Sequence, residues 1–242
     1  MERKHFLKSL LVGVISTPAL LSACGKESEE ATPATGSTGT GTGGTGSGTC
    51  TVAPTETVGP FPTKAPASYV RSNIVDGKMG HPLTAKITIK NSSNNCAVLS
   101  GALVDIWHCD AEGSYSEYGG NGMQATNYQA VHFLRGRQIT DANGLVTFTT
   151  IFPGWYNGRA THIHVHIYSA SGTSLKVTQI AFPEGAGTAL AAVNGYGKGL
   201  SGYTYNKSDS VFSDDTTGVE IATVTGSTSA GFELTMTLNV AV

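Results

Sequence analysis

Hydrophobic and polar residues alternate with a period of two in several short runs between residues 83 and 242. In residues 83–90, Leu, Ala and Ile alternate with Thr and Lys. Such alternation predicts a β-strand with one buried face and one face toward solvent. The same pattern predicts further strands over residues 102–107, 146–150, 162–167, 177–181 and 232–242.

Turn sequences separate these runs. Residues 91–95 are polar, and residues 141–144 read Asp-Ala-Asn-Gly, which is typical of a tight turn. Only residues 188–193 suggest a short helix. Several short strands with turns between them predict one all-β domain, an antiparallel β-sandwich, over residues 50–242.

Residues 1–23 have the composition of an export signal. A basic start is followed by an apolar run over residues 10–21, which is shorter than the roughly 20 residues of a membrane-spanning helix. The ending Leu-Ser-Ala-Cys resembles the lipobox of bacterial lipoproteins, which implies cleavage before Cys24 and attachment of lipid to Cys24. We therefore expect an exported protein anchored in the bilayer of the bacterial cell envelope, in the periplasm or at the cell surface. A soluble secreted protein with an incidental Cys24 is the alternative.

The export route stays open, because residues 3–8 resemble a twin-arginine signal whose second arginine is replaced. Residues 24–49 are rich in Gly, Thr and Ser, cannot bury much apolar surface and predict a disordered tether. The net charge of -2, with 13% charged residues, gives no reason to expect nucleic-acid binding. The oligomeric state cannot be inferred from these patterns.

With Cys24 assigned to lipid, three cysteines are left: Cys50, Cys96 and Cys109. An oxidising compartment allows one disulfide among them, and their spacing does not match a zinc motif. We favour a bond that includes Cys96, because it lies in a polar loop.

Residues 162–166 read His-Ile-His-Val-His, which places three imidazoles on one face of a strand. Neutral imidazole is a common ligand of Fe, Cu and Zn. By itself this pattern also fits a surface strand with scattered histidines. Two tyrosines accompany it: Tyr156 follows a Pro-Gly-Trp turn, and Tyr115 follows the end of a predicted strand.

Tyr115, Tyr156, His162 and His164 lie in two of four motifs that occur in order along most of residues 50–242. The chain resembles the intradiol ring-cleavage dioxygenases, the relatives of protocatechuate and catechol dioxygenases. The matching stretches are residues 54–61, 102–116, 133–141 and 150–164. The resemblance implies the β-sandwich of that family.

The resemblance also implies a ferric ion held by Tyr115, Tyr156, His162 and His164. Fe³⁺ is a hard cation that favours anionic oxygen, and its charge can remove the proton of a tyrosine whose pKa is ordinarily about 10. The implied reaction splits a small aromatic diol between its two hydroxylated carbons with O₂ and yields a muconate-type diacid.

Two side chains carry catalytic roles by the same resemblance. Tyr115 would leave the metal and take a proton from the substrate, as a general base. Arg159 would stabilise negative charge on the ring, whereas its structural interpretation is a salt bridge. Gln179 is a weaker candidate for a place beside the pocket. No basic residue is evident for a substrate carboxylate, which favours plain or alkyl catechols over protocatechuate.

Two other functions fit parts of the pattern. In the first, the His-x-His-x-His strand (His162, His164 and His166) binds Zn²⁺ or Cu²⁺ in a lipoprotein, which leaves both tyrosines unexplained. In the second, the domain is a non-catalytic surface β-sandwich. Its exposed binding aromatics would then be Trp107, Trp155 and Tyr118.

Overall fold

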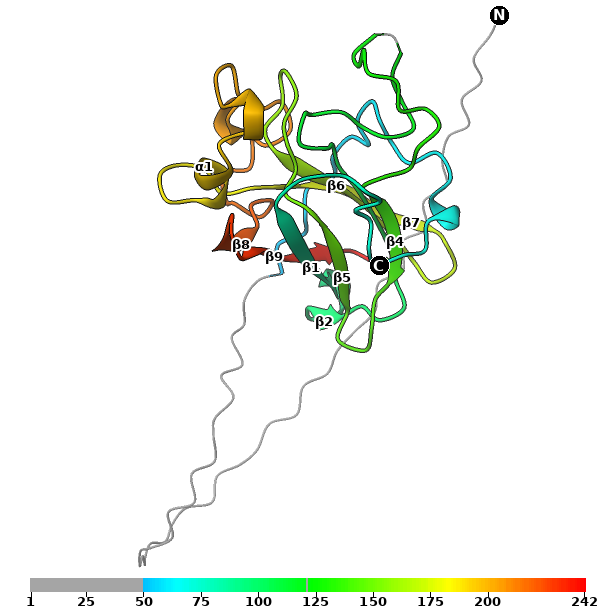
Figure 1. Ribbon diagram of the computed structural model, residues 1–242. Helices are drawn as coiled ribbons and strands as arrows, with labels where there is room; N and C mark the ends of the chain where they lie inside the picture. The colour runs from blue at the N-terminus through cyan, green and yellow to red at the C-terminus, as the bar shows by residue number, and fades with distance from the viewer. Residues whose placement is uncertain (1–49, 121) are drawn as a thin grey trace, which may run out of the picture. The chain divides into compact units, whose positions relative to one another are not determined.

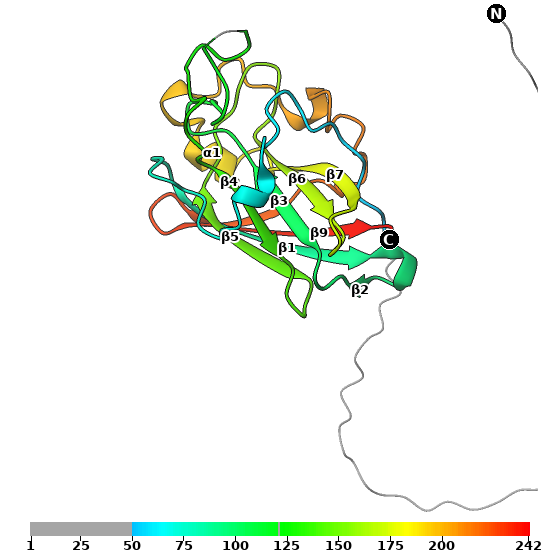
Figure 2. The ribbon, with the colours of Figure 1, turned by 90° about the vertical axis from the view of Figure 1, so that its right-hand side faces the viewer.

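The computed structural model describes residues 50–120 and 122–242, and these form two β-sheets that pack face to face (Figures 1 and 2). The predicted all-β sandwich is confirmed. The predicted signal (1–23), the tether (24–49) and Cys24 lie outside the described residues. The first sheet contains β1 (Pro82–Asn91), β2 (Ala97–Val98), β5 (Leu145–Ile151), β8 (Thr223–Ser227) and β9 (Gly231–Val240). The second sheet contains β3 (Leu103–Trp107), β4 (Arg135–Ile139), β6 (His162–Tyr168) and β7 (Ser174–Ala181).

Strand pairing in the second sheet follows the order β4-β3-β6-β7, with every pair antiparallel. In the first sheet β1 pairs with β9 in parallel, from Leu83 opposite Phe232 to Asn91 opposite Val240. This pair departs from the antiparallel arrangement that the strand pattern predicted. The two strands lie at opposite ends of the domain sequence, so no tight hairpin joins them and either direction is sterically open.

The core lies between the two sheets. Side chains of β1 such as Ile87 and Ile89 point inward and are fully buried, as are Ile163 and Val165 of β6. Each buried Ile stabilises the fold by about 1.5–3 kcal/mol relative to an exposed one. Because side chains alternate along a strand, the histidines of β6 face the opposite way, toward the loops that cover this sheet.

Three strands were missed by the periodicity analysis: β2, β4 and β8. Strand β4 reads Arg-Gly-Arg-Gln-Ile, which shows no alternation of apolar and polar residues. Its buried side chain is Arg135, whose guanidinium donates to the backbone carbonyls of Phe61 and Ser116. A buried arginine satisfied by loop carbonyls gives no hydrophobic signal.

Helical structure is scarce among the described residues. The predicted helix is present as α1 (Ala189–Val193), capped by Thr188, whose hydroxyl accepts from the Ala191 N–H at 3.3 Å. Single 3₁₀ turns occur at Pro66–Ser68, Ser92–Asn94, Tyr196–Lys198 and Asn206–Ser208. Within residues 50–120 and 122–242, no helix has the length and apolarity needed to cross a membrane.

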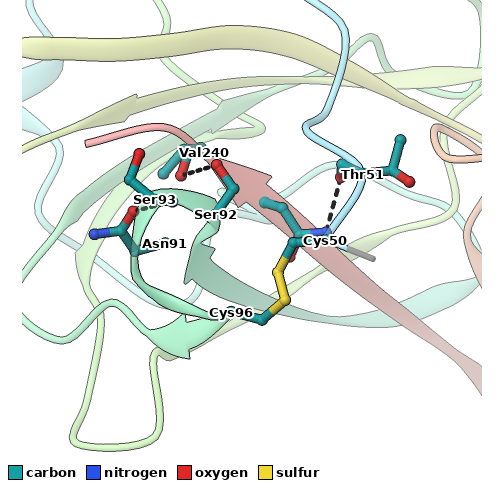
Figure 3. The surroundings of a disulfide bond; sticks show 8 residues. Cys50, Thr51, Asn91, Ser92, Ser93, Cys96 and Val240 are labelled. Atoms are coloured by element: carbon teal, nitrogen blue, oxygen red, sulfur yellow. Dashed lines mark hydrogen bonds between the residues drawn. A yellow bond between two sulfur atoms is a disulfide. The ribbon is translucent and has the colours of Figure 1, made fainter. Parts of the chain in front are cut away.

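A disulfide joins Cys50 to Cys96, with 5.8 Å between the two Cα atoms (Figure 3). The expectation that Cys96 takes part in the bond is confirmed. The bond fastens the start of the domain to the loop that follows β1, next to the end of β9, where the Ser92 hydroxyl donates to the Val240 carbonyl at 3.1 Å. Cys109 is a free, buried thiol.

Because the disulfide closes a loop of 46 residues, its removal should enlarge the conformational entropy of the unfolded chain. We expect Cys96→Ser to lower the free energy of unfolding by about 2–4 kcal/mol. Denaturant titrations of both proteins, with and without dithiothreitol, measure this. Reductant should lower the midpoint of the wild type and leave that of Cys96→Ser unchanged. Equal midpoints for the oxidised wild type and the variant would contradict the prediction.

Candidate metal centre

Three polar side chains converge on the outer face of β6. The Tyr115 hydroxyl lies 3.1 Å from His162 Nε2, which in turn lies 3.1 Å from His164 Nε2. All three side chains are buried. The two histidines come from β6, and Tyr115 comes from the loop that follows β3.

Neighbouring strands and backbone fix the two imidazole rings. In the sheet register Trp107 of β3 lies opposite His164, and their rings stack in parallel planes at 4.9 Å. His162 is held differently, because its Nδ1–H donates to the Ala160 carbonyl at 2.6 Å. A carbonyl can only accept, so Nδ1 of His162 carries the proton and its Nε2 directs a lone pair toward Tyr115 and His164.

Two polar atoms compete for the Nε2 lone pair of His162. His162 Nε2 has a single lone pair in the ring plane, yet the Tyr115 hydroxyl and His164 Nε2 both lie within hydrogen-bond distance of it. Whichever tautomer His164 adopts, this lone pair faces either a second donor or a second lone pair, and neither arrangement is favourable. A cation between the three atoms would satisfy all of them at once.

The pKa values point the same way. Burial, together with the charge of Arg159, lowers the pKa of His162 to about 3, and burial with the neighbouring His162 ring holds the pKa of His164 well below its usual range. Both imidazoles are therefore neutral near pH 7 and able to bind a metal. Burial raises the pKa of Tyr115 well above its ordinary value. A phenolate at this position therefore needs a cation beside it.

Tyr156 borders the same cluster. Its half-buried ring lies 5.8 Å from the ring of Tyr115 and 5.8 Å from that of His162, centroid to centroid. Burial raises the pKa of Tyr156, and the nearby Arg159 guanidinium offsets part of that rise. The structure thus brings together the four residues that the sequence predicted as metal ligands.

The spacing of the donor atoms fits one metal ion. Two ligand atoms at about 2.1 Å from an ion and roughly 95° apart are ~3.1 Å from each other. This matches the separations from Tyr115 to His162 and from His162 to His164. Tyr115, His162 and His164 therefore suit a metal that accepts both oxygen and nitrogen ligands.

His166 does not join the cluster. Its Nε2 is bonded to the Ser174 hydroxyl at 2.8 Å, its Nδ1 to the Tyr168 hydroxyl at 2.8 Å, and its ring stacks on Tyr168. No group of three or more His, Cys, Asp or Glu side chains placed to hold a metal occurs in the described part of the chain. The three-histidine site for Zn²⁺ or Cu²⁺ is therefore not favoured.

Arg159 is both a salt-bridge partner and a neighbour of the cluster. Its Nε donates to the Asp209 carboxylate at 2.9 Å, and its Nη2 donates to Gln179 Oε1 at 2.6 Å. Burial alone would lower the pKa of the Arg159 guanidinium, but the hydrogen bond and charge of Asp209 raise it above its ordinary value. Arg159 therefore stays charged, and Gln179 lies beside the site as its sequence position suggested.

The N-terminal segment, residues 54–61, covers the cluster. Phe61 stacks on Tyr115 with ring centroids 4.8 Å apart, and the Thr57 carbonyl accepts from Gln179 Nε2 at 2.9 Å. Gly59 has φ of +69°, and a Cβ added there would lie 2.8 Å from Cε1 of His164. Only glycine lets the backbone approach this imidazole so closely.

Some residues around the site carry no sequence signal. Gln124 accepts from the Tyr115 N–H at 2.6 Å and donates to the Tyr115 carbonyl at 2.8 Å, which fixes the backbone of this tyrosine. Asp209 holds Arg159 from a segment in which we found no motif. Both belong to irregular loops, where hydrophobic periodicity gives no information.

The aromatics required for a surface-binding sandwich are not exposed. Trp107 and Trp155 are each only 2% exposed, and Tyr118 is partly buried against Phe61. These rings pack inside the domain and do not form an exposed binding surface.

Comparisons with known proteins identify the family of this chain. A family model described as "Dioxygenase" matches residues 61–193, which is more than half of the chain. An intradiol ring-cleavage dioxygenase from Tetranychus urticae is similar in structure, with TM-score 0.69 and 30% identity over 79% of this chain and 95% of that chain. A search of curated protein sequences gives no significant match.

Two bacterial structures are also similar. The dioxygenase domain of a dioxygenase–carbohydrate-binding protein fusion from Streptomyces sp. SirexAA-E has TM-score 0.58 and 25% identity, over 79% of this chain and 99% of that chain. Hydroxyquinol 1,2-dioxygenase from Pseudomonas putida DLL-E4 has TM-score 0.55 and 16% identity, over 79% of this chain and 67% of that chain, and supports the fold alone.

The family match over residues 61–193 therefore places the chain among the dioxygenases. More narrowly, the chain belongs to the intradiol ring-cleavage dioxygenases, enzymes that open catechol-type rings. The resemblance seen in the sequence motifs is confirmed.

Replacement of either converging histidine should impair metal binding. We expect His162→Ala and His164→Ala each to lower metal affinity by more than about 10-fold, since even the loss of an outer partner of a metal ligand costs about 10–100-fold. His166→Ala, the matched control on the same strand face, should bind like the wild type. Elemental analysis of purified variants measures bound metal. Equal losses in all three variants would contradict the two-histidine site.

Proposed function

We propose that this protein is a ferric-iron dioxygenase that splits a catechol-type ring between its two hydroxylated carbons with O₂. The product would be a muconate-type diacid. The observation that carries the proposal is the buried set of Tyr115, His162 and His164, with 3.1 Å between successive donor atoms. Membership of the intradiol family supports the reaction class.

The proposed metal ligands are Tyr115, Tyr156, His162 and His164. A bound ferric ion would supply Lewis-acid activation of the chelated diol. Phenolate oxygen suits this hard cation better than it suits Zn²⁺ or Cu²⁺, which favours iron at a site with two tyrosines.

Tyr115 is the proposed general base. Burial raises the pKa of its phenol well above the ordinary value, so the free side chain strongly prefers to hold a proton. A Tyr115 phenolate displaced by the substrate would accept the proton of the second substrate hydroxyl and retain it. Phe61 and Gln124 hold the ring and the backbone of Tyr115 in place for this transfer.

Arg159 is the proposed electrostatic stabiliser. Its guanidinium remains charged beside Tyr156, where negative charge would develop on the bound diol. A fixed cation in a water-poor site stabilises such charge more strongly than it would in water.

The substrate class is a plain or alkyl catechol. The other buried arginine near the site, Arg135, donates to Ser116, Phe61 and Thr63 and has no group free for a substrate carboxylate. Arg159 is likewise engaged by Asp209 and Gln179. A substrate carboxylate would therefore have to compete with these acceptors for an arginine.

Export and lipid anchoring complete the proposal. The basic start, short apolar run and Leu-Ser-Ala-Cys sequence of residues 1–24 support cleavage before Cys24 and lipidation of Cys24. The disulfide between Cys50 and Cys96 suits the oxidising envelope compartment. Residues 25–49 would then connect the lipid to the catalytic domain.

Purified protein should contain about one ferric ion per chain, with a red-brown tyrosinate absorption band, and should consume O₂ when catechol is added. Tyr115→Phe should lower kcat by about 10²–10⁴-fold, because the general base is lost. An oxygen electrode and the ultraviolet absorbance of the diacid product measure the rate.

Tyr118→Phe is the matched control for this loss, because the Tyr118 hydroxyl donates to the Pro62 carbonyl and does not reach the cluster. It should keep the wild-type rate. A colourless protein loaded with zinc, or stoichiometric iron without oxygen uptake, would refute the proposed function. Faster turnover of protocatechuate than of catechol would reverse only the substrate assignment.

Expression of the full chain in a bacterial host tests the anchor. Wild-type protein should fractionate with membranes, and mass spectrometry should find acyl groups on Cys24. Cys24→Ser should move to the soluble fraction, because the acyl chains supply the hydrophobic binding energy. Cys109→Ser should stay with the membranes as wild type does, and equal membrane binding of the Cys24→Ser protein would disprove lipidation.

A further inference from the structure

We propose that Asp209 is a positioning residue for the reaction, holding Arg159 and His162 in one rigid arrangement. This inference rests on the proposed function. Asp209 lies outside residues 61–193, which match the family, and it belongs to a covering segment that we define as residues 203–212. Figures 1 and 2 show this orange segment on the side of β6 that faces away from β1 and β9.

The carboxylate of Asp209 is fully engaged. Its Oδ1 and Oδ2 lie 3.1 and 2.9 Å from Nε of Arg159, so the arginine donates to both oxygens. Oδ2 also accepts from the Ala160 N–H at 2.6 Å, and Oδ1 accepts from the Val211 N–H at 2.8 Å. Asp209 is 0% exposed. A buried carboxylate with these partners has one stable orientation.

Ala160 connects this carboxylate to a proposed metal ligand. Its N–H donates to Asp209, and its carbonyl accepts from His162 Nδ1 at 2.6 Å. Ala160 thus links the two side chains. Asp209 fixes its N–H, and its carbonyl sets the tautomer and the direction of the His162 ring. A change at Asp209 would be transmitted through one residue to Nε2 of His162.

The remainder of the covering segment supports the same stretch of backbone. The Tyr203 hydroxyl accepts from the Thr161 N–H at 2.9 Å, directly after Ala160. The Phe212 ring lies 5.7 Å from the Arg159 guanidinium and 6.4 Å from the His162 ring. Residues 159–162 are therefore held from outside the sheet at consecutive positions.

Asp209 also decides where the charge of Arg159 lies. With Nε held by Asp209 and Nη2 held by Gln179, the guanidinium has two fixed anchors. The guanidinium also forms a hydrogen bond with the Tyr156 side chain. Loss of the carboxylate would leave Gln179 and Tyr156 as the side-chain partners of Arg159 and would loosen the position of the cation.

The variant Asp209→Asn keeps the size of the side chain and removes its charge. Asp215→Asn is the matched control, since Asp215 lies in the same region and accepts from backbone N–H groups of Val219 and Glu220, without contact to Arg159. The experiment uses the iron-loaded full-length protein with catechol. It measures kcat, KM, bound iron and the tyrosinate band for both variants, for Arg159→Gln and for the double variant Asp209→Asn/Arg159→Gln.

We expect Asp209→Asn to retain iron, to lower kcat by about 10–100-fold with a smaller effect on KM, and to shift the tyrosinate band as His162 reorients. In the double variant, the fold-loss of kcat should be well below the product of the two single losses, because Asp209 acts partly through Arg159. Asp215→Asn should leave kcat and the band unchanged.

Multiplicative effects in the double variant, an unchanged band, or a loss of kcat that only follows loss of bound iron would each overturn the role of Asp209. Wild-type protein that consumes no O₂ would refute the proposed function and this inference together. Active wild type with an equally active Asp209→Asn variant would refute this inference alone.

Discussion

The organisation of this site depends on the contacts of one buried atom, Nε2 of His162. His162 Nε2 lies 3.1 Å from the Tyr115 hydroxyl and 3.1 Å from His164 Nε2, in surroundings that exclude water. Burial keeps both imidazoles uncharged and makes a phenolate costly on its own. The site holds buried polar groups that one cation would satisfy together, so it suits a metal ion.

The β-sandwich provides the rigidity that such a site needs. Ile163 and Val165 anchor β6 in the core between the sheets, and this holds His162 and His164 on the opposite face at fixed spacing. The loops then finish the site from above: residues 54–61 cover the rings, and residues 203–212 hold the backbone that precedes β6. The proposed catalytic side chains thus come from a rigid strand and from the loops that cover it.

Two buried arginines near the cluster have different roles. Arg159 and Arg135 are both buried close to the cluster, and each is surrounded by acceptors from loops distant in sequence. Arg135 ties the covering N-terminal segment to β4 through the Phe61 carbonyl, whereas Arg159 lies next to Tyr156. One arginine therefore supports the structure, and the other carries the proposed chemistry.

Local patterns in the sequence determined the strands whose faces differ in polarity, including β1 and β6, and they placed His162 and His164 on a common face. The family motifs added Tyr115 and Tyr156. Periodicity reports which way a side chain points relative to its own strand, and for that purpose the sequence was sufficient.

Only the tertiary structure decided which distant groups meet. The parallel pairing of β1 with β9, the choice of Cys50 as partner of Cys96 and the contact of Asp209 with Arg159 all join residues far apart in the chain. The sequence pattern did not predict strand β4, because its buried side chain is a charged arginine that donates to loop carbonyls. Such partners are selected by the packing of the whole domain, and no short stretch of sequence contains that information.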